Sequence, residues 1–275
     1  MRALISADME GATGVTCPDD CIPGTSQYAR FRPIFTADVN AVALGFLDAG
    51  LDEVVVTEAH DGMRNLLLEQ LDPRISLVTG RHKTYAMLEG ISPDTDVAAF
   101  VGYHSAAGTA GVLSHTFMGT QLVAVTLNGR LMSEGYLNAM LCAEYGVRLA
   151  LVSGDDLTCA DAADYAPTAR GVVVKEAVDR YTARCLSPEV TAAMLRSAAA
   201  AAVESAAVPV LPEPPYTCEL EFANTSCPGA VAQIPGVERP SPRVVRFGYP
   251  SVDEVYRCFA AATRLASLAI EREYG

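Results

Sequence analysis

The sequence lacks the long apolar runs of membrane proteins and any excess of basic charge. No stretch of its 275 residues approaches the run of about 18 apolar residues that a membrane-spanning helix needs. Twenty basic residues stand against 33 acidic ones, a net charge of −13, which argues against a nucleic-acid partner. The N-terminal segment is short and interrupted by Asp8, so it does not fit a secretory signal. These absences predict a soluble, cytoplasmic protein.

The cysteines lack a repeated short spacing. The chain has eight, at Cys17, Cys21, Cys142, Cys159, Cys185, Cys218, Cys227 and Cys258. Only Cys17 and Cys21 lie close together, and no second pair completes a tetrahedral thiolate site. A structural zinc at this pair is one alternative. The scattered spacing favours the other, free thiols in a reducing cytosol, most of them buried as small hydrophobic residues.

Repeats, low-complexity tails and phosphate-binding loops are also missing. The stretch GYHSAAGTAG (102–111) is rich in glycine, but no lysine follows it as a phosphate-binding loop requires. The acidic pair in GDD (154–156) follows an apolar run and could belong to a metal motif. A helix N-cap with a first-turn carboxylate explains it better.

Apolar runs alternate with helical patterns through the first two thirds of the chain. We expect strands at 2–7, 53–58, 75–79, 97–102, 148–153 and 171–175, and helices at 28–49, 134–146 and 156–163. Asn128-Gly129 predicts a tight hairpin within QLVAVTLNGRLM (121–132). This alternation indicates an α/β fold with a doubly wound, mostly parallel sheet flanked by helices.

The composition changes after Ser187-Pro188. An alanine-rich helix is expected at 189–207, followed by the proline-rich VPVLPEPP (208–215). Strands at 218–224 and 243–249 and a helix from Val252 to about Glu273 complete the chain. We therefore expect a metal-binding α/β domain over 1–188 and a smaller C-terminal α+β domain over 189–275.

Carboxylates and imidazoles follow the apolar runs. Asp8 and Glu10 come after the first run, His60 after the run at 53–58, and His104 after the run at 97–102. The carboxyl ends of parallel strands converge on one crevice. The two-residue spacing of Asp8 and Glu10 puts both on one face of an extended chain. Glu134 begins an expected helix, where the helix dipole favours a carboxylate.

Three carboxylates and two imidazoles without a thiolate suit zinc, manganese or iron. A two-metal hydrolytic site with one shared carboxylate is the most economical arrangement. Each residue alone has a simpler explanation, because aspartates cap turns and many histidines are merely hydrogen-bonded. Their occurrence together, at three strand ends and one helix start, favours a metal site.

The other two histidines differ in context. His115 follows a small-residue loop 11 positions after His104 and could lie over the same crevice as a base or nucleophile. His82 lies in a basic loop, TGRHKT, and is expected outside the site. Tyr28, Arg30 and Arg32 could contact an anionic substrate group, but a solvated helix face explains them better.

Several of these motifs together resemble the D-aminopeptidase DppA family, peptidase family M55. They are DMEG (8–11), EAHDGMRNL (58–66), GYH (102–104), GVLSH (111–115), SEGYLNA (133–139), SGDD (153–156), RCLSP (184–188) and EFAN (221–224). The resemblance runs in order through nearly the whole chain. It implies a binuclear zinc aminopeptidase, acting on short peptides with an N-terminal D-residue such as D-Ala, and a homodecameric ring.

The resemblance also implies roles for six residues. Asp8 bridges both zinc ions; Glu10 and His104 complete one, and His60 and Glu134 the other. His115 matches the residue described in the family as the nucleophile, and a general base acting on water is an alternative role. Preference for D-residues rests on the resemblance alone. Another metal-dependent amidohydrolase or esterase, and a non-catalytic dipeptide-binding protein, remain alternative functions.

Overall fold

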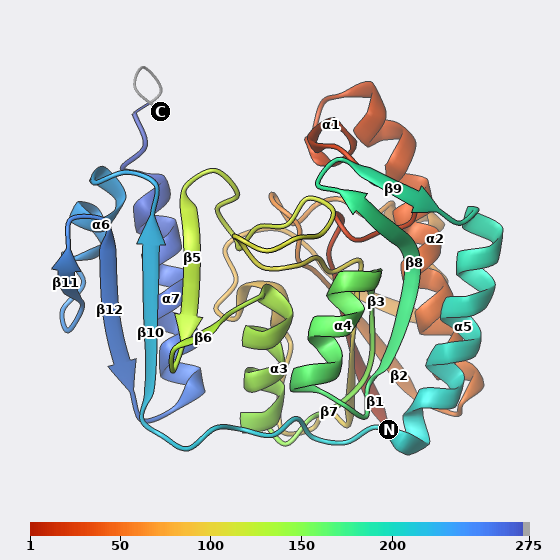
Figure 1. The fold of residues 1–275 in the computed structure, drawn as a ribbon. Coiled ribbons are helices and arrows are strands. Elements are labelled where there is room, and N and C mark those ends of the chain that lie inside the picture. Colours follow the sequence, from red (N-terminus) through yellow and green to blue (C-terminus); the bar gives the residue numbers. More distant parts are fainter. Residues whose placement is uncertain (272–275) are drawn as a thin grey trace.

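Two β-sheets form the framework of the chain, which the computed structural model describes over residues 1–271 (Figure 1). Sheet A has the strand order β3-β2-β1-β4-β7-β8-β9. Its strands are β1 (Arg2–Ala7), β2 (Glu53–Glu58), β3 (Ile75–Val78), β4 (Val97–Val101), β7 (Arg148–Asp155), β8 (Arg170–Asp179) and β9 (Thr182–Cys185). All neighbours pair in parallel except β8 and β9, which form an antiparallel hairpin. The expected doubly wound, mostly parallel sheet is confirmed.

Helices cover both faces of sheet A. Helices α2 (Ser26–Asp48) and α5 (Pro188–Ser205) pack against each other on one face. Helices α3 (Glu134–Glu144) and α4 (Asp156–Tyr165) lie on the other face, between the two sheets as Figure 1 shows. Short helical turns lie in the connections between these elements: α1 (Pro18–Cys21) between β1 and α2, and the 3₁₀ turns η1 (Leu68–Gln70) and η2 (Ala86–Leu88) on either side of β3.

Sheet B is antiparallel, with the order β11-β12-β10-β5-β6. Its strands are β5 (Leu122–Leu127), β6 (Arg130–Leu131), β10 (Tyr216–Phe222), β11 (Glu238–Ser241) and β12 (Val244–Tyr249). Helix α7 (Val252–Ser267) packs on β10 and β12 and contacts α3, and α6 (Ser226–Val231) packs on α7. The hairpin expected at Asn128-Gly129 joins β5 to β6.

The two sheets do not follow the boundary expected between residues 188 and 189. Strand β5, within 1–188, pairs with β10 in sheet B, and β6 pairs with β5. Helix α5, within 189–275 apart from its first residue, packs on α2, which covers one face of sheet A. The chain enters sheet B twice, at β5–β6 and at β10–β12, so sheet membership does not follow position along the chain.

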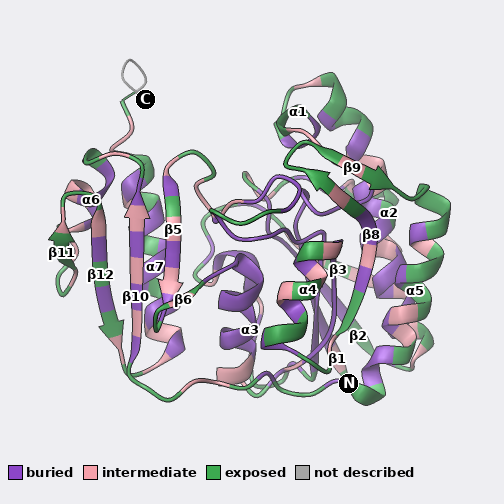
Figure 2. Cartoon of the chain, viewed as in Figure 1, coloured by how far each residue is buried: buried purple, intermediate pink, exposed green. Residues whose placement is uncertain are grey.

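The core is divided between the two faces of sheet A. Ala3 and Ile5 of β1 contact the cluster under α2 and α5, whereas Leu4 points into the cluster shared with α3 and sheet B. Strands β1 and β4 are consequently buried on both faces, and helix α3, between the sheets, is also buried along most of its length (Figure 2). Double burial explains why the sequence shows the two strands as continuous apolar runs.

The long elements lie where the sequence predicts them, and so do the short strand β3 and the β5–β6 hairpin, whereas other short elements were not predicted. Helix α1, α6, β9 and β11 carry four to six residues each, too few for a periodic pattern. The last helix ends at Ser267, and Glu273, where it was expected to end, lies outside the described residues. No helix within residues 1–271 is long and apolar enough to cross a membrane.

Candidate metal centre

The candidate ligands gather at the carboxyl ends of three adjacent strands. Asp8 follows β1, His60 follows β2 and His104 follows β4, and these strands are neighbours in the order β2-β1-β4. The strand order reverses around β1, which is the position where open α/β sheets place their ligands. Glu134 is the first residue of α3, whose N-cap Ser133 accepts a hydrogen bond from the Tyr136 amide.

Glycines let the strand ends approach closely. A Cβ at Gly102 would lie 2.0 Å from the Asp8 carbonyl oxygen, and one at Gly11 would lie 1.8 Å from the Tyr103 carbonyl oxygen. Gly102 also has φ of +73°, which favours glycine. The motifs DMEG and GYH therefore owe their glycines to this approach, which brings Asp8 beside His104.

Glu58 holds the loop that carries His60. Its carboxylate accepts hydrogen bonds from the amides of Asn65 and Leu66, at 2.8–3.0 Å. The Asn65 side chain donates to the His60 carbonyl at 2.8 Å. The segment EAHDGMRNL thus closes on itself, and this closure fixes the position of the imidazole.

Six side chains converge, in two groups joined by Asp8. His60 Nδ1 lies 2.9 Å from Glu10 Oε2 and 3.6 Å from Asp8 Oδ1. His104 Nε2 lies 3.4 Å from both Asp8 Oδ2 and Glu134 Oε1. His60 therefore neighbours Glu10, and His104 neighbours Glu134. The expected assignment of Glu10 and His104 to one ion and of His60 and Glu134 to the other stays a prediction, because ligand atoms of Glu10, His104 and His115 also lie within 4.8 Å of one another.

Backbone carbonyls orient all three imidazoles. His60 Nε2 donates to the Cys21 carbonyl at 3.0 Å, His104 Nδ1 to the Ser105 carbonyl at 3.1 Å, and His115 Nδ1 to the Leu113 carbonyl at 2.8 Å. A carbonyl only accepts, so the proton is on that nitrogen in each neutral ring. The other nitrogen of each ring then presents its lone pair to the carboxylates, as in metal-ligating histidines.

These facing acceptors need a cation between them. Asp8 Oδ2, Glu10 Oε2 and His104 Nε2 are buried and lack a hydrogen-bond partner within residues 1–271. Buried polar atoms are rarely left in this state. A metal ion would satisfy them together, so the residues fit a metal centre with carboxylate and imidazole ligands.

Protons occupy the same positions when no metal is bound. Burial lowers the pKa of His60 and His104, but the adjacent charges of Glu10 and Glu134 outweigh burial and raise both pKa values well above the usual range. Burial raises the pKa of Asp8, yet the two imidazoles bring that pKa down to about 2. The cluster thus favours positive charge between its carboxylates.

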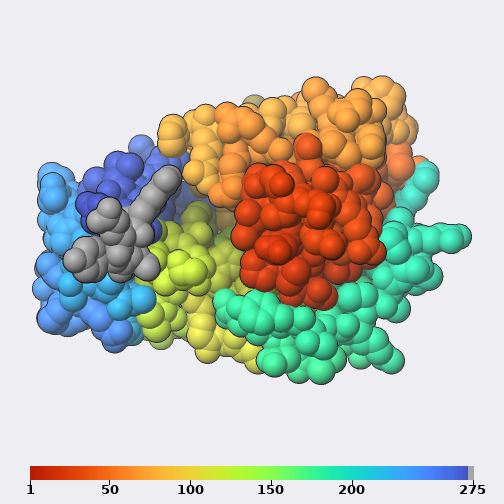
Figure 3. All heavy atoms as spheres, turned by 90° about the horizontal axis from the view of Figure 1, so that it is seen from above, coloured from red at the N-terminus to blue at the C-terminus, as the bar shows by residue number. Residues whose placement is uncertain are grey.

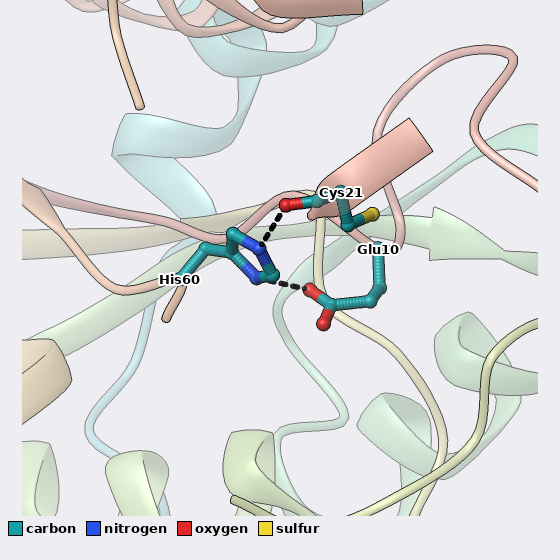
Figure 4. Close-up of side chains that lie close together, drawn as sticks. All are labelled: Glu10, Cys21 and His60. Carbon is teal, nitrogen blue, oxygen red and sulfur yellow. Dashed lines mark hydrogen bonds and ion pairs between the residues drawn. The ribbon is translucent and has the colours of Figure 1, made fainter. Parts of the chain in front are cut away.

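Cys21 is a neighbour of this cluster that the sequence did not place there. Its sulfur and ligand atoms of Glu10 and His60 lie within 4.8 Å of one another, and Figure 4 shows the three side chains. Burial raises the thiol's pKa far above its usual range. None of the eight cysteines forms a disulfide.

His115 stands over the second group of ligands. Its ring stacks on His104 with centroids 4.1 Å apart and planes 6° apart. Its Nε2 lies 3.6 Å from Glu10 and 3.9 Å from Glu134. Leu113 and Phe117 flank it with φ of 54°, a left-handed conformation that is uncommon for residues other than glycine. The loop holds this imidazole over the crevice.

The comparisons with known proteins agree with this geometry. Residues 1–261 match the family model described as D-aminopeptidase, Peptidase M55. The chain belongs to this family. It is 32% identical over 271 residues to the D-aminopeptidase of Bacillus subtilis strain 168, covering 97% of this chain and 98% of the relative. Membership confirms the expected class of enzyme, a metallo-aminopeptidase.

A solved structure supports the family assignment. It is described as the Zn-dependent D-aminopeptidase DppA from Bacillus subtilis, a self-compartmentalizing protease. The two folds agree with a TM-score of 0.92 at 30% sequence identity, over 97% of this chain and 98% of the other. The expected D-aminopeptidase fold is therefore confirmed.

The centre of this family member opens into a pocket of about 860 Å³. Seen from above, N-terminal, central and C-terminal residues surround the hollow (Figure 3). Carboxylates and imidazoles of the cluster form one part of its wall, and apolar side chains such as Phe117 and Met118 form another. Four cationic side chains line the pocket: Arg81, Lys83, Arg180 and Arg264. Arg81 and Lys83 belong to the basic loop TGRHKT. Arg180 and Arg264 were not anticipated, because they come from distant segments that no sequence spacing connects.

Four other expectations have clear outcomes. His82 lines the pocket, although it was expected outside the site. Arg32 donates to the carbonyls of Asn65 and Leu66, so it holds the His60 loop against α2. Neither Tyr28, Arg30 nor Arg32 lines the pocket, and the expected solvated helix face holds for exposed Arg30 but not for Tyr28, which is buried. Asp155 caps α4, as GDD suggested, by accepting from the Thr158 amide.

Proposed function

We propose that the protein is a binuclear zinc aminopeptidase that cleaves the first peptide bond of short peptides, with a D-residue such as D-Ala at the N-terminus. One observation carries the binuclear assignment. The two oxygens of Asp8 face different imidazoles, Oδ1 toward His60 and Oδ2 toward His104. Asp8 would bridge two ions, with Glu10, His60, His104 and Glu134 as the other ligands.

The zinc dependence of the Bacillus subtilis structure supports zinc as the ion. Manganese and iron also suit a set of carboxylate and imidazole ligands. Bound zinc would supply a Lewis acid for the scissile carbonyl and increase the acidity of the attacking water.

His115 would handle the proton or make the attack itself. Its Nδ1 is occupied by the Leu113 carbonyl, so Nε2 is the free basic nitrogen. Stacking on His104 and the left-handed residues on either side keep this nitrogen over the ligands. As a general base it would accept a proton from water, and as a nucleophile it would attack the carbonyl carbon.

The assembly is part of the same proposal. The Bacillus subtilis relative is described as self-compartmentalizing, which supports a homo-oligomer, and the family resemblance suggests a decameric ring. We also propose a cytoplasmic location, which agrees with the eight free cysteines. The partner of the site is then a short peptide that enters an enclosed compartment.

A paired assay of turnover and metal content tests the function. Purified protein should release D-alanine from D-Ala-D-Ala faster than L-alanine from L-Ala-L-Ala, with about two zinc ions per chain, and should lose activity with a chelator. His115→Ala should keep the zinc and lose turnover by about 10²- to 10⁴-fold. Two zinc ions without cleavage of either peptide would refute the aminopeptidase and indicate another hydrolase or a binding protein.

A further inference from the structure

We propose that Arg180 binds the free C-terminal carboxylate of the peptide, so that the site selects short peptides with an unmodified C-terminus. This inference rests on the proposed aminopeptidase function and adds a specificity residue to it. It starts from the turn between β8 and β9, whose tip carries Arg180 and Tyr181 and lines the pocket beside the metal centre.

Arg180 is attached to the segment that carries His115. Its carbonyl accepts a hydrogen bond from the Leu113 amide at 2.9 Å. Its Nη1 donates to the Ser114 hydroxyl at 3.2 Å, and the next residue is His115. The guanidinium group therefore lies close to the residue that would act on the scissile bond, on the wall of the same pocket.

The charge of Arg180 is available for a ligand. Its guanidinium has two hydroxyl partners, Ser114 and Tyr181, and forms no ion pair with any carboxylate within residues 1–271. The ring of Tyr181 supports it, with the guanidinium carbon 5.7 Å from the centroid. A planar guanidinium with free N–H groups beside an aromatic ring suits two-point binding of a carboxylate.

The other cations of the pocket are already engaged or lie elsewhere. Arg81 pairs with Asp61 at 3.2 Å. Lys83 is buried and donates to three oxygens, at Thr57, Glu58 and Val78. Arg264, on α7, hydrogen-bonds to the Lys83 carbonyl. Within the described chain, no hydrogen bond joins Arg264 to the His115 segment.

The dimensions of a short peptide agree with this choice. The scissile carbonyl of a dipeptide would face the metal centre, and its carboxylate follows one residue later, about 3.8 Å further along the chain. The group that meets this carboxylate must adjoin the catalytic residue. Arg180, hydrogen-bonded to Ser114, meets this requirement.

A comparison of two substrates distinguishes recognition of the C-terminal carboxylate by Arg180 from positioning of the His115 loop. We would measure kcat/KM for D-Ala-D-Ala and for its C-terminal amide, in zinc-loaded wild type, Arg180→Gln, Arg180→Lys and the control Arg264→Gln. The ratio of acid to amide should fall about 10- to 100-fold in Arg180→Gln, because a charged hydrogen-bond pair is lost. It should recover in part in Arg180→Lys and stay at the wild-type value in Arg264→Gln.

Two results would overturn the proposal. Equal loss on both substrates in Arg180→Gln would mean that Arg180 only positions the His115 loop. A changed ratio in Arg264→Gln, with none in Arg180→Gln, would assign the carboxylate to the other arginine.

Calorimetric binding keeps the test independent of turnover. In zinc-loaded His115→Ala, D-Ala-D-Ala should bind more tightly than its amide, and adding Arg180→Gln should remove the difference. Equal binding of acid and amide to His115→Ala would also refute carboxylate recognition. If wild type cleaves neither peptide but this difference appears, the aminopeptidase function fails while the role of Arg180 stands.

Discussion

Lys175 is a buried cation beneath the Glu10 loop. The chain contains two lysines, Lys83 and Lys175, and both are buried. Lys175 Nζ donates to the carbonyls of Glu10 at 2.6 Å, Ala12 at 3.0 Å and Val15 at 2.6 Å. A compact ammonium fits three converging carbonyls better than a planar guanidinium does. Lys175 thus shapes the backbone that presents Glu10 to the metal centre.

Replacing this lysine should weaken the metal centre. In Lys175→Met, three carbonyls lose their shared donor, which costs about 1–3 kcal/mol of unfolding free energy for each carbonyl left unsatisfied. We expect zinc affinity to fall about 10- to 100-fold, as when other supports of metal ligands are removed. Chelator competition on folded protein measures this affinity. Arg170→Met, exposed on the same strand, is the control; unchanged affinity in Lys175→Met would contradict the role.

Asp38 is a buried carboxylate on α2 that braces the same loop. It accepts hydrogen bonds from the amide and hydroxyl of Thr13, at 2.9 and 3.0 Å. Burial raises its pKa to about 6, although the bonds from Thr13 oppose this. Between its unfolded pKa and about 6, the folded chain holds more protons than the unfolded chain. Stability contributed by the protonated form is therefore lost as pH rises through this window.

Asp38→Asn should remove this pH dependence. The unfolding free energy of wild type, relative to Asp38→Asn, should fall by about 2–3 kcal/mol between pH 4 and pH 7. Urea unfolding at several pH values in this range measures the difference. Asp94→Asn, at an exposed aspartate, controls for the loss of one carboxylate. A constant or rising difference would show that Asp38 is ionised throughout.

At the residue scale, the sequence identifies groups that act where strands end. Asp8, Glu10, His60 and His104 follow apolar runs, and the structure brings them together. Lys175 lies within a strand and contacts residues about 160 positions away. Such a contact depends on the strand order β4-β7-β8, and no local pattern encodes it. The ligand grouping likewise required distances between side chains.

At the scale of elements, the α2–α5 contact depends on one small residue. A Cβ at Gly45 would lie 2.4 Å from the Arg196 carbonyl oxygen and 2.7 Å from the Ala199 Cβ. The helices approach closely there because Gly45 has no side chain and α5 is rich in alanine. The sequence predicted both helices but not their contact, because helical periodicity identifies a buried face without identifying its partner.

Gly45→Ala should destabilise the chain despite alanine's higher helix propensity. Alanine gains about 1 kcal/mol in an isolated helix, but the clash would force the helices apart at a cost of about 1–3 kcal/mol. We expect a net decrease in the free energy of urea unfolding. Ala37→Gly, at an exposed position of α2, should lose only the unfolding free energy that follows from the lower helix propensity of glycine. A more stable Gly45→Ala protein would mean that α5 shifts freely.

At the scale of the whole molecule, the metal centre joins elements that are distant in sequence. Its candidate ligands come from the ends of β1, β2 and β4 and the start of α3. The adjoining pocket extends to α7, which packs on sheet B. Bound ions would therefore connect the sheet A strands with the layer of helices between the two sheets. Stability of the entire chain should depend on metal content.

Zinc should accordingly raise the melting temperature of the chelator-treated protein. A ligand that binds only the folded state adds about 2.7 kcal/mol per site at a concentration 100 times its Kd. For a chain of this size, each kcal/mol raises the melting temperature by about 2–4 °C. Scanning calorimetry should show the increase in His115→Ala, which keeps every candidate ligand, but not in Asp8→Asn, which loses the bridge. An equal increase in Asp8→Asn would show that the stabilising zinc binds elsewhere.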